Sequence, residues 1–181
     1  LHRFSIKVNI MNNFNRFKGK VAFIQGGSRG IGAAIVERLA LEGASVAFTF
    51  VSSHEKAKAL AENLTSQGSK KVIAIKADST KPEDIRNAIS ETIEQLGQID
   101  IVVNNSGTLI WDSIEKLTMD DWDKTINTNV RSVFVAIHEA AKHMNNNGRI
   151  INISSTNAQR IPFAGGSIYG MSKSALTGLV K

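Results

Sequence analysis

Apolar and polar positions follow two different periods along the chain. Short runs rich in Val, Ile and Phe are typical of buried strands, whereas longer stretches place apolar residues every three or four positions, as helices do. The pattern predicts strands at 20–26, 45–51, 71–77, 99–105 and 148–155. It predicts helices at 31–43, 54–68, 81–97, 118–144 and 167–181.

Strands that alternate with helices, and that are apolar on both faces, indicate an α/β domain with a parallel sheet covered on both sides. We expect one domain over residues 18–181 and an N-terminal extension, poorly ordered, over residues 1–17. The longest irregular stretch, residues 156–166, follows the end of a predicted strand. Such sheets bind ligands at the carboxyl ends of their strands.

The formal net charge of +6 is concentrated at the start of the chain. Arg3, Lys7, Arg16, Lys18 and Lys20 precede residue 21 without any acidic residue, which leaves 17 basic against 16 acidic residues in the rest. This distribution does not predict a nucleic-acid partner. The chain has no cysteine, which excludes disulfide scaffolds, thiolate zinc sites and cysteine nucleophiles. No apolar run predicts a membrane span, and we expect a cytoplasmic protein.

A glycine-rich turn joins the first predicted strand to the first predicted helix. Gly26, Gly30 and Gly32 occur in QGGSRGIG with the spacing G-x-x-x-G-x-G. Glycines permit a tight turn whose backbone N–H groups approach a pyrophosphate at the start of the following helix. A glycine cluster alone also fits a plain strand-to-helix turn, but its position here favours a dinucleotide site.

The end of the second predicted strand indicates which dinucleotide is bound. NAD-binding proteins place Asp or Glu there, where it holds the ribose 2′-hydroxyl. This chain reads TFVSS at 49–53, with no acid. Arg29 and the hydroxyls of Ser52 and Ser53 suit an additional phosphate, so the predicted cofactor is NADP(H). The two serines also suit the start of the next helix as caps, and both roles are compatible.

Five motifs, in order, resemble those of the short-chain dehydrogenase/reductase family. They are the loop GGSRGIG, Asp78 in KADST, NNSG at 104–107, Asn129 in INTNVRSVF, and Ser155 followed by the pair Tyr169-x-x-x-Lys173. The resemblance runs from about Lys18 to Lys181. Within the family, the sequence looks most like bacterial NADPH-dependent 3-oxoacyl-carrier-protein reductases.

The resemblance implies a Rossmann-like doubly wound parallel sheet and a set of site residues. The catalytic residues it implies are Asn129, Ser155, Tyr169 and Lys173. The cofactor contacts it implies are Gly26, Ser28, Arg29, Gly30, Ile31, Gly32, Ser52, Asp78, Asn105, Gly107, Tyr169 and Lys173.

Two positions depart from the family pattern. Gln25 stands where the family usually has Thr, which leaves the hydrogen bonding of the glycine turn open. Ser106 replaces the usual Ala beside the adenosine ribose. We expect neither change to abolish cofactor binding.

The Tyr–Lys spacing matters because hydride addition to a ketone leaves an alkoxide that needs a proton. A phenol is a slow acid at neutral pH, and a nearby ammonium stabilises its phenolate. Residues four apart share a helix face, so Lys173 can assist Tyr169 and also reach the nicotinamide ribose. A plain surface Tyr–Lys pair is the structural alternative. By resemblance, Asn129 holds a water that links Lys173 to solvent; the alternative for Asn129 is an internal helix hydrogen bond.

Ser155 is predicted to polarise the substrate carbonyl, with Ser154 as the competing candidate. Adjacent side chains on a strand point to opposite faces, so only one of the two serines can face the cofactor, and the resemblance selects Ser155. His138 and His143 have a poor metal spacing, and no metal site is predicted. Trp111 and Trp122 are interpreted as packing residues.

Family members are longer than this chain, so the resemblance implies a domain that is truncated at its C-terminus and lacks its substrate loop. The leading hypothesis is an NADPH-dependent ketone reductase, with a small molecule or a 3-oxoacyl thioester as substrate and a homo-oligomeric full-length form. One alternative is a non-catalytic nucleotide-binding protein, and another is an inactive fragment of a reductase. Neither a nucleic acid nor a membrane is an expected partner.

Overall fold

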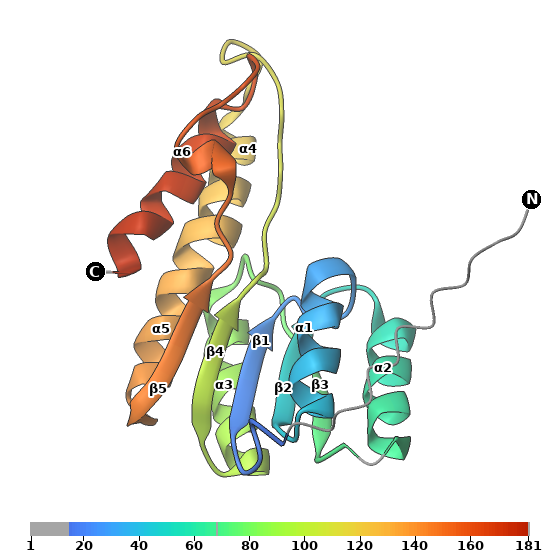
Figure 1. The fold of residues 1–181 in the computed structure, drawn as a ribbon. Coiled ribbons are helices and arrows are strands. Elements are labelled where there is room, and N and C mark those ends of the chain that lie inside the picture. Colours follow the sequence, from blue (N-terminus) through green and yellow to red (C-terminus); the bar gives the residue numbers. More distant parts are fainter. Residues whose placement is uncertain (1–14, 68, 181) are drawn as a thin grey trace, which may run out of the picture.

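The computed structural model describes residues 15–67 and 69–180, and its centre is a parallel sheet (Figure 1). The strands stand in the order β3-β2-β1-β4-β5, and all neighbours run parallel. Since the order reverses direction between β1 and β4, the predicted doubly wound α/β sheet is confirmed. The strands are β1 (Val21–Gln25), β2 (Ser45–Phe50), β3 (Val72–Lys76), β4 (Ile99–Asn104) and β5 (Met144–Asn152).

Helices lie on both faces of this sheet because its strands are apolar on both sides. Ala22 and Ile24 of β1 pack with the residues of α1 (Gly30–Leu41) and α2 (His54–Ser66) in one core cluster. Phe23, the residue between them, packs in a second cluster with α3 (Pro82–Leu96) and α5 (Ser132–Ala141). The alternation along a strand therefore produces two cores, one on each side of the sheet.

The prediction of one continuous helix over 118–144 is wrong, because the helix is interrupted and ends earlier. It consists of α4 (Met119–Ile126), a π-helical turn η1 (Asn127–Arg131) and α5, which ends at Ala141. A capping box begins α4: Thr118 Oγ1 accepts from the backbone N–H of Asp121, whose carboxylate accepts from the backbone N–H of Thr118. Beyond α5 the chain turns and joins the sheet at Met144. Pairing with β4 therefore outweighs the helical pattern of the residues just before it.

The last strand is also displaced from its predicted range of 148–155. Strand β5 starts at Met144, which pairs with Ile99, and the register shifts before Arg149 pairs with Ile101. This bulge accommodates the polar run at 145–148 within a strand, a feature that periodicity does not reveal. The strand ends at Asn152, so the two candidate serines follow the strand instead of lying on it.

The final helix is shorter than predicted. Helix α6 (Ser167–Ala175) is followed by the 3-10 helix η3 (Leu176–Val180), whereas the sequence predicted one helix to 181. A short 3-10 segment, η2 (Thr156–Ala158), lies in the loop between β5 and α6. In Figure 1, α6 lies beside α4 at the carboxyl end of the sheet.

Residues just before position 18, where the domain was predicted to begin, already pack against the core. Phe17 packs against the core on the α1 side, and its backbone N–H donates to the Glu42 carbonyl at 3.0 Å. The carboxylate of Glu42 accepts from Arg16 and Arg38. The hydrogen bond from Arg16 is the main reason that the pKa of Glu42 falls to about 2. Residues 1–14, the rest of the predicted extension, lie outside the described residues.

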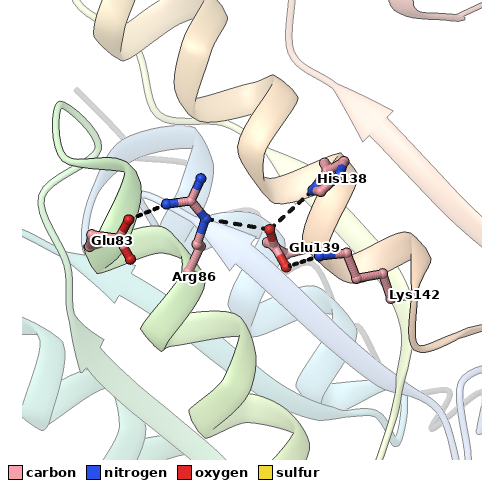
Figure 2. A network of polar contacts seen from close by, with 5 residues as sticks. All are labelled: Glu83, Arg86, His138, Glu139 and Lys142. Carbon is pink, nitrogen blue, oxygen red and sulfur yellow. Dashed lines mark hydrogen bonds and ion pairs between the residues drawn. The ribbon is translucent and has the colours of Figure 1, made fainter.

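A charged network joins α3 to α5 on the outside of the fold (Figure 2). The Glu139 carboxylate on α5 accepts from Lys142 Nζ at 2.6 Å and pairs with Arg86 on α3 at 3.4 Å. Arg86 also pairs with Glu83, and His138 contacts Glu139 at 3.0 Å. The bond from Lys142, followed by that from His138, lowers the pKa of Glu139 to about 2.

Among the described helices, we find none with the length and apolar character that a membrane span requires.

Candidate active site and cofactor cleft

A cleft of about 570 Å³ opens at the carboxyl ends of the strands. It is bordered by the glycine turn, the ends of β2 and β3, and the loop that follows β4. Ten of the residues predicted to contact the cofactor line this one cleft: Gly26, Ser28, Arg29, Gly30, Ile31, Gly32, Ser52, Asp78, Asn105 and Gly107.

At Gly26, Gly27 and Gly32, the glycine turn is packed too closely for a side chain. Gly26 has a φ of 71°, and a Cβ on Gly32 would lie 2.0 Å from the Gly26 carbonyl oxygen. The end of β2 holds the turn from the other side: Gly26 N–H donates to Thr49 Oγ1 and Gly27 N–H donates to the Thr49 carbonyl, both at 2.9 Å. Asn105 Nδ2 donates to the Gly26 carbonyl at 2.9 Å. The turn is therefore held in place by hydrogen bonds to the protein's own groups.

The structure resolves the hydrogen bonding left open by Gln25. Its side chain is completely buried and donates to the Ser132 carbonyl of α5 at 3.1 Å, away from the glycine turn. Its Oε1 atom has no hydrogen-bond partner among the described residues. The hydroxyl group that contacts the turn comes from Thr49 instead. Thr49 was missed in the sequence, although a buried polar residue inside the apolar run VAFTF is a usable signal.

Three further polar side chains line the cleft, those of Asp78, Arg29 and Ser53. Asp78 Oδ1 accepts from Thr80 N–H at 2.9 Å and from Thr80 Oγ1 at 2.8 Å, which fixes the direction of the carboxylate. Arg29 is exposed and forms no ion pair within the described part of the chain. Ser53 is the N-cap residue of α2, but its side chain makes no capping hydrogen bond. The hydroxyl of Ser53 therefore does not take up the capping role.

Asn129 connects three segments at the other end of the cleft. It is completely buried in the π-helical turn, accepts from Thr108 N–H at 2.8 Å and donates to the Thr108 carbonyl at 2.9 Å. Its Nδ2 also donates to Ser172 Oγ on α6 at 2.9 Å. A π-helical turn often marks a functional site in a helix. The alternative of an internal helix hydrogen bond does not apply, because all three bonds leave the helix; the predicted water relay stays a prediction.

Lys173 extends from α6 to the edge of the cleft. Its side-chain amine donates to the Ile153 carbonyl at 2.9 Å. A Cβ built on Gly107 would lie 3.4 Å from that amine and 3.6 Å from Asn129 Oδ1. Lys173 is 5% exposed, and desolvation lowers its pKa. The Lys173 amine is therefore buried at the margin of the cleft, where Gly107 leaves room for it. This placement excludes the alternative of a Tyr–Lys pair exposed on the surface.

The two serines after β5 have different contacts. Ser154 Oγ donates to the backbone carbonyl of Lys173 at 3.1 Å and so anchors α6. Ser155 Oγ accepts from Asn157 N–H at 3.1 Å, which leaves its own hydrogen available. Of the two hydroxyls, that of Ser155 is therefore the one able to donate to a substrate oxygen.

Tyr169 lies one turn before Lys173 on α6 and is half-buried. Its hydroxyl has no hydrogen-bond partner among the residues that the structure describes. Asn129, Ser155, Tyr169 and Lys173 do not line the 570 Å³ cleft themselves; Lys173 and Asn129 adjoin it at Gly107. Further lining residues that the sequence did not indicate are Phe50, Val51, Ser79, Thr80, Thr108, Lys124 and Thr128.

Comparisons with known proteins agree with this geometry. Residues 20–181 match the family model described as short chain dehydrogenase. A hydroxynaphthalene reductase-like protein of Metarhizium majus is 37% identical over 163 residues, which cover 90% of this chain and 61% of the relative. The chain therefore spans less than two thirds of that curated relative.

Two solved structures have the same fold. A short-chain dehydrogenase/reductase from Serratia marcescens is 55% identical with a TM-score of 0.89, over 91% of this chain and 67% of that one. A short chain dehydrogenase from Burkholderia cenocepacia, solved in complex with NADP, is 48% identical with a TM-score of 0.88, over 91% of this chain and 66% of that one.

Across 15–67 and 69–180, no group of three or more His, Asp or Glu side chains is placed to hold a metal ion.

Proposed function

Because the chain belongs to the short-chain dehydrogenase family, as the sequence predicted, we propose that it acts as an NADPH-dependent oxidoreductase that reduces a ketone to an alcohol. One observation carries the proposal. A single cleft gathers ten predicted cofactor residues, and its Gly107 end adjoins the buried amine of Lys173, one helical turn from Tyr169.

The cleft suits NADP(H). Gly26, Gly27 and Gly32 have no room for side chains, and without side chains the backbone here can approach a pyrophosphate closely, at the start of α1. Arg29 and Ser52 line the cleft without an acidic neighbour at the end of β2, which favours a 2′-phosphate. Asp78, oriented by Thr80, is available to the adenine. When bound, the cofactor supplies the hydride.

The chain's own residues supply the proton and polarise the carbonyl group. Ser155 Oγ–H donates to the substrate carbonyl oxygen, which becomes more negative as the hydride arrives. Tyr169 delivers its phenolic proton to that oxygen, and the Lys173 ammonium stabilises the phenolate that remains. Through a water, Asn129 links Lys173 to solvent so that the tyrosine is protonated again.

The proposed substrate is a 3-oxoacyl thioester. Its support is the resemblance of the motifs to 3-oxoacyl-carrier-protein reductases. The name of the Metarhizium relative makes an aromatic ketone the competing substrate class. For the whole protein we further propose a cytoplasmic homo-oligomer.

The test is NADPH oxidation by the protein expressed from its complete gene, with a 3-oxoacyl thioester and an aromatic ketone as substrates. We expect turnover of the thioester and a loss of about 10²- to 10⁴-fold in Tyr169→Phe, with NADPH affinity retained. Met171→Leu, an exposed change on the same helix, is the control. Unchanged turnover in Tyr169→Phe would defeat the mechanism, and NADPH binding without turnover of any ketone would favour a non-catalytic nucleotide-binding protein.

A further inference from the structure

Two loops at the carboxyl edge of the sheet are joined through Trp111. One loop follows β4 and the other connects β5 to α6, and both rise above the sheet in Figure 1. Trp111 Nε1 donates to the Ala164 carbonyl at 2.8 Å, and Asp112 N–H donates to the Gly165 carbonyl at 3.1 Å. Consecutive residues of the first loop thus bind consecutive carbonyls of the second.

The indole ring of Trp111 covers two glycines of the second loop. A Cβ on Gly165 would lie 2.6 Å from the ring atom Nε1, and a Cβ on Gly166 would lie 2.7 Å from Cη2. Gly165 also has a φ of 100°, a conformation that other residues rarely adopt. The five-membered ring therefore lies against Gly165 and the six-membered ring against Gly166. Neither position has room for a side chain while the indole occupies this place.

Gly166 is also the N-cap residue of α6, the helix that carries Tyr169. This helix starts without a side-chain capping hydrogen bond, and the buried hydroxyl of Ser167 has no partner among the described residues. Its later part is anchored by Lys173, whose amine donates to the Ile153 carbonyl just after β5, and by Ser172, whose hydroxyl accepts from Asn129 in the π-helical turn. In the first turn, the Tyr169 carbonyl accepts from Ser172 Oγ at 2.7 Å, whereas the start of the helix at Gly166 is packed against the Trp111 indole.

We propose that Trp111 is a positioning residue that sets the place of the Tyr169 hydroxyl by holding the first turn of α6. The inference rests on the proposed function, in which Tyr169 delivers a proton. Displacement of a reacting group by about 1 Å can lower a rate about 100-fold. Trp111 does not line the cofactor cleft, so its loss affects proton delivery and not nucleotide affinity.

The chain offers a matched control, because its other tryptophan has almost the same exposure. Trp122 on α4 is 37% exposed and Trp111 is 39% exposed. The Trp122 indole makes no hydrogen bond to any residue that the structure describes. Any general effect of deleting a half-exposed indole should therefore occur in both positions.

The experiment compares Trp111→Ala, Trp111→Phe and Trp122→Ala in the complete protein. We expect kcat to fall about 10- to 100-fold in Trp111→Ala, with the KM for NADPH changed less than about twofold. Trp111→Phe retains a ring over the glycines but loses the N–H donor, so it should lie between Trp111→Ala and the wild type. Trp122→Ala should keep the wild-type kcat. Equal losses in Trp111→Ala and Trp122→Ala would overturn the proposal.

Amide hydrogen exchange gives a readout that does not require turnover. In Trp111→Ala, the Gly170 amide of α6, which donates to the Gly166 carbonyl at 2.8 Å, should exchange faster, while the amides of α1 should not, and Trp122→Ala should leave both unchanged. Unchanged exchange in α6 would overturn the inference even if kcat fell. If no variant or wild type turns over a ketone, the proposed function fails, and faster exchange in Trp111→Ala still tests the contact itself.

A double-variant cycle isolates the contact between the ring and the glycine. Gly166→Ala alone places a methyl group against the indole and should lower kcat as Trp111→Ala does. Added to Trp111→Ala, the same change should cost little more, because the ring is gone and the next nearest atom, Ile161 Cγ2, lies farther away, at 3.0 Å. Additive losses would contradict a shared mechanism.

Discussion

The proposed cofactor end and the proposed catalytic end of the site are built in different ways. The cofactor end consists mainly of backbone from one short stretch, the glycine turn, supported by the adjacent strand end at Thr49 and by Asn105. The catalytic end consists of side chains from separate segments: the π-helical turn, the loop after β5, and α6. The first depends on local geometry, whereas the second depends on how distant elements pack.

This difference predicts different responses to substitution. A change at the cofactor end should alter nucleotide affinity and leave the chemical step intact. A change at the catalytic end should alter kcat, because it displaces groups that act only in the transition state. Three substitutions test this contrast, one at each end and one outside both.

The largest effect is expected for Asn129→Ala. The change removes two donated bonds and one accepted bond that join the loop after β4 to α6. We expect kcat to fall about 100-fold, since both the position of α6 and the proton relay are lost. Steady-state kinetics with saturating NADPH measures this. Asn127→Ala, in the same π-helical turn but without a side-chain hydrogen bond among the described residues, is the control. A change in NADPH affinity alone would contradict the contrast.

A smaller effect is expected for Arg29→Ala at the cofactor end. A charge-assisted hydrogen bond to a phosphate contributes about 1.5–3 kcal/mol, so the KM for NADPH should rise at least about tenfold. The KM for NADH should change little, because NADH has no 2′-phosphate. The ratio of the two kcat/KM values measures the effect, with Arg131→Ala, an exposed arginine outside the cleft, as the control. Equal losses for both nucleotides would show that Arg29 does not recognise that phosphate.

The smallest effect is expected outside both ends, at Glu139. Its pKa in the folded chain is about 2, below the ordinary value of 4.5, so its stabilising contribution is complete above 4.5 and is lost as the pH falls toward 2. Glu139→Gln should lower the melting temperature at neutral pH by about 1–2 °C and flatten its decline between those two pH values. Kinetics should be unchanged. Glu94→Gln, on the exposed side of α3, should change neither the melting temperature nor its dependence on pH. If Glu139→Gln and the wild type lost melting temperature equally as the pH falls, the network would not contribute to stability.

The family, the sheet and the contents of the cleft could be read from the sequence for a physical reason. Strand and helix periods are local, and the glycine turn places its cofactor groups within a few residues of each other. Ten predicted residues therefore line one cleft, and no long-range contact is needed to place most of them. The assignment of chemical roles to those residues stays a prediction that the variants above test.

Element ends were predicted less well, because packing overrides propensity there. The helix predicted over 118–144 is interrupted at Asn127–Arg131 and ends at Ala141, since the following residues enter the sheet beside β4. The strand end predicted at 155 lies at Asn152, because the chain turns into the 3-10 segment η2. Ser154 and Ser155 therefore lie beyond the strand, so the alternation of side chains along a strand does not apply to them. Their different hydrogen bonds distinguish the two serines instead.

The order of strands and helices, the glycine turn and the Tyr–Lys spacing are properties of neighbouring residues, so the sequence by itself determined them. The bonds of Asn129, the contact of the Thr49 hydroxyl with the glycine turn, and the Trp111 contact with Gly165 and Gly166 were decided only by the tertiary structure. Each joins residues more than 20 positions apart. Such contacts depend on which elements lie side by side and on the space between them, and no pattern of neighbouring residues contains that information.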